Sequence, residues 1–348
     1  MAHCHARRRG TVLRVRTSTG LSRIIAGLFA LVLLAGAGPT SPGRDITLET
    51  RTVRFDPQHP EAARFGALQW RGGIEVWSGD KAFGGFSGLA VSADGGSLVA
   101  VSDKGRWLTA NLIYRNGRLA AVGQARMAPM IGADGRPLNG KDDSDAESVT
   151  ADGGGALLVS FERNNRLLRY DFSGPAPSPP EKIELPPALD ASPYNKSIEA
   201  IGRFAPAGRL GGILIVITER MLDQRGNIIG WLIGTGPARR FTLRRIGDFD
   251  VTDLAILPGG DVVTLERRFS LLNGPGMMMR RIARDTIRAG ALLDGPVLLR
   301  AGASYSIDNM EGLSLHRSED GELRLTLISD DNFNLLQRTL IMQFAISE

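Results

Sequence analysis

The stretch ESVTADGGGALLVSFE, residues 147–162, contains two short apolar runs joined by a turn rich in Asp and Gly. An acidic residue stands at each end of it, Glu147 at the start and Glu162 at the finish. Short Val/Leu/Ile-rich runs broken by Gly and Asp are typical of all-β sandwiches, barrels and propellers. We therefore expect this stretch to form a hairpin within an all-β fold.

The same pattern occurs four more times along the chain. Its copies are 60, 52, 53 and 59 residues apart when these positions are taken as equivalent: Leu89, Val149, Ile201, Leu254 and Leu313. Further strand-like runs follow each copy. A four-stranded unit repeating at about 40–50 residues is typical of propeller blades, and wider spacing indicates longer loops. The repeats predict a β-propeller of five or six blades.

The last copy supplies at most three strands, the final one over Leu340–Ile346. A further strand-like segment, Ala67–Trp77, precedes the first copy. We expect this N-terminal strand to complete the last blade and close the ring, because closure leaves no long unpaired sheet edge.

The N-terminal residues differ from the rest. Six Arg residues precede and adjoin the apolar run Ile24–Leu34, and small residues follow up to Ala37. This order is typical of a secretory signal peptide, and the run is shorter than the roughly 20 residues that span a bilayer. We predict a signal peptide over 1–37, an extension over 38–64 and a propeller domain over 65–348. The protein is then expected to be periplasmic or secreted, with no membrane span after leader removal; an uncleaved anchor is the alternative.

Charge and residue usage exclude several functions. The chain has 42 Lys+Arg and 37 Asp+Glu, but residues 1–37 hold six Arg and no acid, which leaves 36 against 37 in the mature part. No basic footprint for nucleic acid remains. The single cysteine, Cys4, lies in the leader, and only His59 and His316 lie beyond it. This shortage disfavours Ser-His-Asp catalysis and multi-histidine zinc sites.

Two positions in each copy are expected to meet at one mouth of the central channel, because the two strands of a hairpin are antiparallel. The first set is Ser87, Glu147, Glu199, Asp253 and Glu311, and the second is Asp103, Glu162, Glu219, Glu266 and Asp330. Nine of these ten residues are carboxylic acids, whose mutual repulsion favours bound cations. Oxygen ligands without Cys or His favour Ca²⁺ or Mg²⁺.

Basic residues follow the second acid in four copies: Lys104, Arg163, Arg220 and Arg267. Acids and bases at one mouth suit a metal together with an anionic group such as phosphate. We predict seven metal ligands, Asp103, Glu147, Glu162, Glu199, Asp253, Glu311 and Asp330. The four bases are predicted to bind substrate, and Glu219 and Glu266 are the catalytic candidates. The alternative is that strand-end acids cap turns and prevent edge aggregation.

Two other acidic stretches are rich in oxygen ligands. One covers residues 142–147, immediately before and into the second copy, and the other covers residues 330–334 after the fifth copy. Neither has the spacing of an EF-hand loop. Each is interpreted either as a calcium-binding segment or as a solvated loop.

Four segments resemble the phytase-like family, which is also described as having an esterase-like activity of phytase: Phe86–Leu89, Asp145–Val149, Leu265–Arg267 and Asn309–Leu313. The resemblance covers roughly residues 65–347. It implies an exported bacterial propeller related to calcium-dependent β-propeller phytases, which hold calcium ions and a phosphate at one mouth. It implies that the matching acids and bases are Glu147, Glu199, Glu219, Glu266, Glu311, Arg163, Arg220 and Arg267.

Three functions remain open. The first is a calcium-dependent hydrolase of phosphate esters that acts on a small anionic, phosphorylated substrate through an activated water. The second is a non-catalytic envelope propeller whose carboxylate ring is structural or binds a ligand. The third, a carboxylic-ester hydrolase, is disfavoured by the shortage of histidine. In each case we expect a monomer that binds no nucleic acid.

Overall fold

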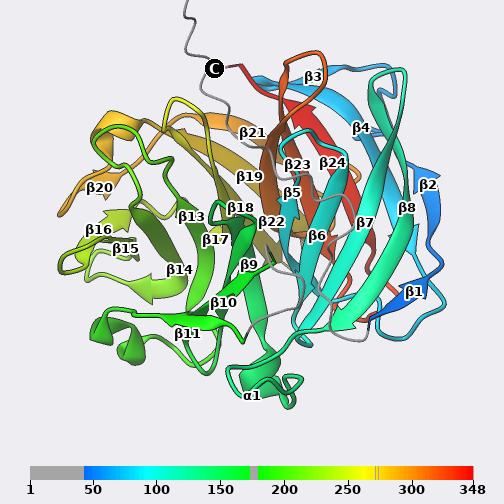
Figure 1. Ribbon diagram of the computed structural model, residues 1–348. Helices are drawn as coiled ribbons and strands as arrows, with labels where there is room; N and C mark the ends of the chain where they lie inside the picture. The colour runs from blue at the N-terminus through cyan, green and yellow to red at the C-terminus, as the bar shows by residue number, and fades with distance from the viewer. Residues whose placement is uncertain (1–42, 173–178, 271, 273, 348) are drawn as a thin grey trace, which may run out of the picture. The chain divides into compact units, whose positions relative to one another are not determined.

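The computed structural model describes residues 43–172, 179–270, 272 and 274–347, and these form five β-sheets (Figure 1). Helical residues in this part are limited to α1 (Lys141–Ser144) and two 3₁₀ turns, Pro187–Ala191 and Arg284–Thr286. The predicted all-β propeller is confirmed, with five blades. The predicted signal peptide, residues 1–37, lies outside the described residues. Within them, no helix is long and apolar enough to cross a membrane.

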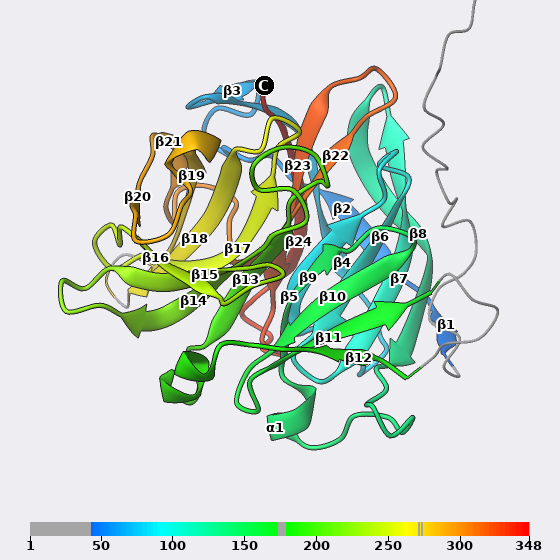
Figure 2. The same ribbon diagram turned by 60° about the vertical axis from the view of Figure 1, so that its left-hand side comes forward.

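The first two sheets contain the first two copies of the repeat. In order from the innermost strand, the first sheet is β5 (Phe86–Val91), β6 (Ser97–Ser102), β7 (Arg106–Arg115), β8 (Arg118–Pro129) and β1 (Arg44–Ile46). The second, which faces the viewer in Figure 2, is β9 (Ala146–Ala151), β10 (Ala156–Phe161), β11 (Arg166–Asp171) and β12 (Glu181–Ile183).

The third and fourth sheets have the same order from the channel outwards. The third is β13 (Ile198–Arg203), β14 (Leu214–Leu222), β15 (Ile228–Ile233), β16 (Arg239–Leu243) and β20 (Leu292–Leu293). The fourth is β17 (Asp250–Ile256), β18 (Val262–Ser270), β19 (Gly274–Ile282) and β21 (Val297–Ala301). Only the short β20 pairs in parallel, with β16.

The fifth sheet combines strands from both ends of the described chain. It contains β22 (Asn309–Arg317), β23 (Leu323–Asp330), β24 (Thr339–Ala345), β4 (Leu68–Trp77) and β2 (Glu49–Thr52), and β3 (Arg64–Phe65) pairs with β4. The segment expected to form a strand over Ala67–Trp77 is β4, which lies antiparallel to β24 with Ile74 opposite Ile341. Part of the expected extension thus adds strands to two sheets, β2 here and β1 in the first sheet.

The innermost strands β5, β9, β13, β17 and β22 contact one another in cyclic order around the channel. Glycine permits the closest approaches. A Cβ atom on Gly88 would lie 2.8 Å from the backbone nitrogen of Val149, and one on Gly312 would lie 2.9 Å from that of Leu89. A larger residue at either position would push neighbouring blades apart.

The hydrophobic core lies between neighbouring sheets. For example, Trp107 of β7 and Tyr170 of β11 meet edge to face, with ring centroids 5.1 Å apart, and join the first sheet to the second. Both rings are almost fully buried. Because large apolar side chains each contribute roughly 1.5–3 kcal/mol on burial, such contacts hold the blades rigidly around the channel.

Candidate active site

Each innermost strand has a β-bulge near its start. The register shifts between Phe86 and Gly88 in β5, and the corresponding shifts in β9, β13, β17 and β22 fall at the same point of the repeat. The bulged residues are Ser87, Glu147, Glu199, Thr252 and Glu311. A bulge turns a side chain away from the regular strand face, and bulges are frequent beside active sites.

The second strand of each hairpin leaves the sheet at the same end. The first residue beyond its paired segment, counted from the equivalent positions of the repeat, is Asp103, Glu162, Glu219, Arg267 or Asp330. All five, together with Ser87, Glu147, Glu199 and Glu311, line one cavity of about 770 Å³. The structure therefore brings two positions per blade to one mouth of the channel.

The fourth blade corrects the predicted ligand set. Its bulged residue is Thr252, and Asp253 lies one residue further along, opposite Leu265. The Asp253 carboxylate is buried and accepts hydrogen bonds from Ser148 Oγ (2.9 Å) and from the backbone nitrogens of Leu254 and Leu313. Burial raises its pKa well above the ordinary value. Asp253 thus ties three inner strands together and does not line the cavity.

Glu266, predicted to be catalytic, is also displaced by one residue. It lies opposite Val251 within the paired strand, and Arg267 occupies the position that is acidic in the other four blades. Its side chain is completely buried, where Oε1 accepts hydrogen bonds from Arg280 Nε and Thr264 Oγ1, each at 2.7 Å. Glu266 therefore belongs to a buried ion pair inside the fourth sheet.

Two of the four predicted substrate-binding bases lie outside the cavity lining. The Lys104 ammonium is 2.9 Å from the ring centroid of Phe333, and the Arg220 guanidinium pairs with Asp250. Arg163 and Arg267 do line the cavity. The ring thus consists of seven carboxylates and one arginine in ten positions, where the sequence predicted nine carboxylates.

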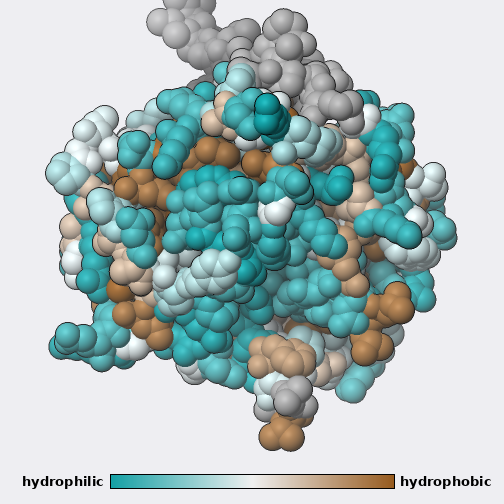
Figure 3. All heavy atoms as spheres, turned by 90° about the horizontal axis from the view of Figure 1, so that it is seen from below, coloured by the Kyte–Doolittle hydropathy of each residue, from teal (hydrophilic) through white to brown (hydrophobic). Residues whose placement is uncertain are grey.

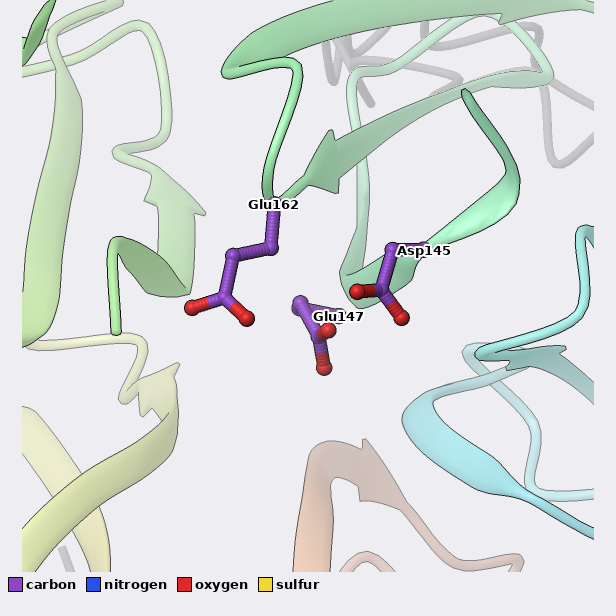
Figure 4. A group of neighbouring side chains, drawn as sticks. All are labelled: Asp145, Glu147 and Glu162. Carbon is purple, nitrogen blue, oxygen red and sulfur yellow. The ribbon is translucent and has the colours of Figure 1, made fainter. Parts of the chain in front are cut away.

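A first carboxylate cluster consists of Asp145, Glu147 and Glu162, whose oxygens come within 4.8 Å of one another. Figure 4 shows the three side chains converging from the start of β9 and the end of β10. Asp145 is held by Lys141 and Arg163, each with a 2.5 Å ion pair. The Arg163 backbone has a left-handed φ of 59°, a sparsely populated conformation for a non-glycine residue.

A second cluster consists of Glu162, Glu199 and Glu219 and shares Glu162 with the first. Glu162 accepts a 2.7 Å hydrogen bond from the Ser197 backbone nitrogen, and Glu219 pairs with Lys196 at 2.8 Å. Among the described residues, Glu147 and Glu199 have neither a hydrogen-bond nor an ion-pair partner. Two acids that face a cavity without partners are the strongest sign of a cation site here.

Proton affinities follow from this crowding. Burial, and then the neighbouring carboxylates, raise the pKa values of Glu147 and Glu199 well above their ordinary values. Burial raises the pKa of Glu162 to about 7, although the Ser197 N–H opposes the shift. Burial, and then Glu311, raise the pKa of Asp330 to about 8. A bound cation would reverse these shifts, because it favours the charged form.

The opposite side of the mouth is already neutralised. Arg267 Nε lies 2.9 Å from Glu311 Oε1, which also accepts a 2.8 Å hydrogen bond from Asn309. Burial disfavours the charge on Arg267, but nearby carboxylates, led by Glu311, outweigh it and raise the arginine pKa. Burial raises the pKa of Glu311, and Arg267 opposes that shift.

The cavity lining suits a hard divalent cation. It contains nine carboxylates, Asp103, Asp145, Glu147, Glu162, Glu199, Glu219, Asp308, Glu311 and Asp330. It contains six basic residues, Lys141, Arg163, Lys196, Arg267, Arg268 and Arg338. This is a formal excess of three negative charges. Carboxylate oxygens in flexible number are the ligands of Ca²⁺, so the residues present fit that ion.

Three residues at this site were not among the predicted ligands and substrate-binding bases. Asp145 lies in the acidic stretch 142–147, so the sequence did carry a signal for it. Lys141 and Lys196 lie in loops before β9 and β13, outside the repeated positions, and no pattern marked them. The second acidic stretch, 330–334, contributes Asp330, Asn332 and Asn334 to the lining.

Comparison with known proteins agrees with the fold. The β-propeller domain of Cps50 (Swd1) from Myceliophteria thermophila is 10% identical, with 87% of this chain and 100% of that chain covered and a TM-score of 0.38. The endo-arabinase from Bacteroides thetaiotaomicron is 11% identical, with 76% and 95% covered and a TM-score of 0.42. No curated protein matches the chain.

The family model described as "Phytase-like: Esterase-like activity of phytase" matches residues 81–333. This segment includes all five hairpins and both carboxylate clusters. The chain therefore belongs to the phytase-like family.

Proposed function

We propose that the protein is a metal-dependent hydrolase of phosphate esters that acts at the acidic mouth of its channel. One observation carries the proposal: two carboxylate clusters share Glu162, and within them Glu147 and Glu199 lack protein partners. The family description supports it. Export to the periplasm or the medium is part of the proposal and is based on the sequence of residues 1–37.

The two clusters would hold two cations, with calcium as the favoured ion. Asp145, Glu147 and Glu162 would hold one, and Glu162, Glu199 and Glu219 the other. When bound, such ions neutralise substrate charge and lower the pKa of a coordinated water. Two divalent ions would also change the formal charge of the lining from three negative to one positive, which favours a phosphate.

The chain's own residues would then position the substrate. Arg163 and Arg267 line the cavity and would donate hydrogen bonds to non-reacting phosphate oxygens. Glu219, whose carboxylate is oriented by Lys196, would accept a proton from the attacking water. Asp330, with its pKa raised to about 8, is protonated at neutral pH and would donate a proton to the leaving oxygen.

The test is hydrolysis of 4-nitrophenyl phosphate, bis(4-nitrophenyl) phosphate and phytate by calcium-loaded protein. We expect activity on at least one ester, and at least about 100-fold less activity for Glu162→Gln, because both clusters lose a ligand. Glu181→Gln, at an exposed position of β12, is the matched control. Inertness toward all three esters overturns the proposal.

A non-catalytic binding propeller is the second candidate, because several acids of the mouth already have basic partners. Asp145, Glu219 and Glu311 each form an ion pair within the protein. If calcium raises the melting temperature and no ester is hydrolysed, this second function replaces the first.

A further inference from the structure

Apolar side chains stand at the edge of the cavity on the fourth and fifth sheets. The hairpin β18–β19 continues past Arg267, with Arg268 opposite Gly276 and Phe269 opposite Pro275. Phe269 and Pro275 both line the cavity, and Phe269 is 66% exposed. The hairpin thus forms an apolar wall beside the acidic site.

The loop between β23 and β24 contributes the other part of this wall. Leu336 lines the cavity and is 90% exposed, and the adjacent Leu335 is fully exposed. Single exposed leucines are common on protein surfaces. Here, however, two belong to one short loop, and one of them, with Phe269, borders the same cavity. We call Phe269, Leu335 and Leu336 the apolar rim.

Figure 3 views the molecule from below Figure 1, the end at which α1 and therefore Asp145 lie. Hydrophilic residues cover the middle of this face, and separate hydrophobic patches lie nearer its edge. A charged centre with apolar side chains at its border matches a ligand that has one anionic end and one apolar end.

Basic side chains adjoin the apolar rim. Arg268 directly precedes Phe269 and lines the cavity, and its buried Nε lacks a hydrogen-bond partner among the described residues. Arg338, two residues after Leu336, also lines the cavity. A buried N–H without a partner is costly unless a ligand accepts its hydrogen bond, and a phosphate oxygen would do so.

We propose that the site takes organic phosphates whose ester group is apolar, such as an alkyl or acyl chain. The phosphate would occupy the charged part of the cavity, and the chain would lie on Phe269, Leu335 and Leu336. The inference is based on the proposed function, since that function places phosphate at the mouth. The apolar rim is then the specificity determinant, because it removes alkyl surface from water and offers nothing to a polar ester.

The test compares octyl phosphate, below its micelle concentration, with methyl phosphate by calorimetric titration of the calcium-loaded protein. We expect octyl phosphate to bind at least about 10-fold more tightly, because burying methylene groups is favourable. The double variant Phe269→Ser, Leu336→Ser should lose this preference and keep its affinity for methyl phosphate. Equal affinities of the wild type for the two phosphates overturn the inference.

Controls separate this inference from a folding defect and from the proposed function. Ile113→Ser removes an apolar residue that is 40% exposed on β7 and does not line the cavity, and should keep the preference. If Ile113→Ser loses it too, the apolar rim is not responsible. If octyl phosphate binds preferentially but is not hydrolysed, hydrolysis fails and this inference holds. If methyl and octyl phosphate are hydrolysed with equal kcat/KM, the inference fails and hydrolysis holds.

A sedimentation arm identifies the source of the amphiphile. The protein is mixed with phosphatidic acid vesicles and, separately, with phosphatidylcholine vesicles. Octyl phosphate binding together with selective sedimentation on phosphatidic acid supports the inference with a lipid headgroup as the phosphate. Octyl phosphate binding without sedimentation supports it with a dispersed phosphate ester. Sedimentation without octyl phosphate binding overturns it, because membrane adsorption would then need no phosphate site.

Discussion

The second and fourth blades present the same hairpin to the channel and opposite chemistry at its mouth. The bulge and exit positions are Glu147 and Glu162 in the second blade, but Thr252 and Arg267 in the fourth. The fourth blade does have two nearby acids, each displaced by one residue, and both are buried. The comparison teaches that the position of an acid relative to the bulge, and not its presence in the repeat, decides whether it belongs to the site.

The largest effect should come from the buried pair of the fourth blade. Glu266→Gln leaves Arg280 charged in a fully buried place, which should cost about 3 kcal/mol of unfolding free energy. Calcium affinity should not change. Urea denaturation and calcium titration measure the two quantities. A stability change below about 1 kcal/mol together with lost calcium binding would place Glu266 in the site instead.

The second blade should respond in the opposite way to the same substitution. Glu162→Gln removes an acid from both clusters, so calcium affinity should fall at least about 100-fold and the calcium-induced rise in melting temperature should disappear. Without calcium, stability should not fall, because repulsion is relieved. Calcium affinity within threefold of wild type would exclude Glu162 as a shared ligand.

The pH dependence of stability should separate the two blades further. The folded pKa of Glu162, about 7, is raised above its unfolded value of about 4.5. Above pH 7 both states are ionised and the folded state carries the penalty; below about pH 4.5 both are protonated and the penalty is gone. In chelator, Glu162→Gln should therefore exceed wild type in stability by about 2–3 kcal/mol at pH 8, and this difference should vanish by pH 4. A pH-independent difference would contradict the pKa shift.

The smallest effect should come from making the mouth of the fourth blade neutral. Arg267→Gln removes the partner of Glu311, so the cavity becomes more negative. Calcium affinity should rise by about three- to tenfold and methyl phosphate affinity should fall. Arg220→Gln is the comparison variant, because Arg220 pairs with Asp250 outside the lining. Equal effects of the two variants would mean that Arg267 acts only through bulk charge.

Much of the fold could be predicted because its signals are local. Leu89, Val149, Ile201, Leu254 and Leu313 were correctly aligned, since each follows the bulge of its blade by the same number of residues. The site was predictable where an acid coincides with the aligned position, as at Glu147 and Glu219. It was not at Asp253 and Glu266, where the nearest acid stood in for the aligned residue.

By itself, the sequence determined that five hairpins repeat and that acids recur at their ends, because apolar runs and Asp/Gly turns act over a few residues. Only the tertiary structure decided which acids face one another. The bulge sets which side chain turns into the channel, and a shift of one residue moves a side chain from the cavity to the interior of a sheet. Lys141, Lys196 and the apolar rim also join the site only through folding, because their loops are distant in sequence and meet at one mouth.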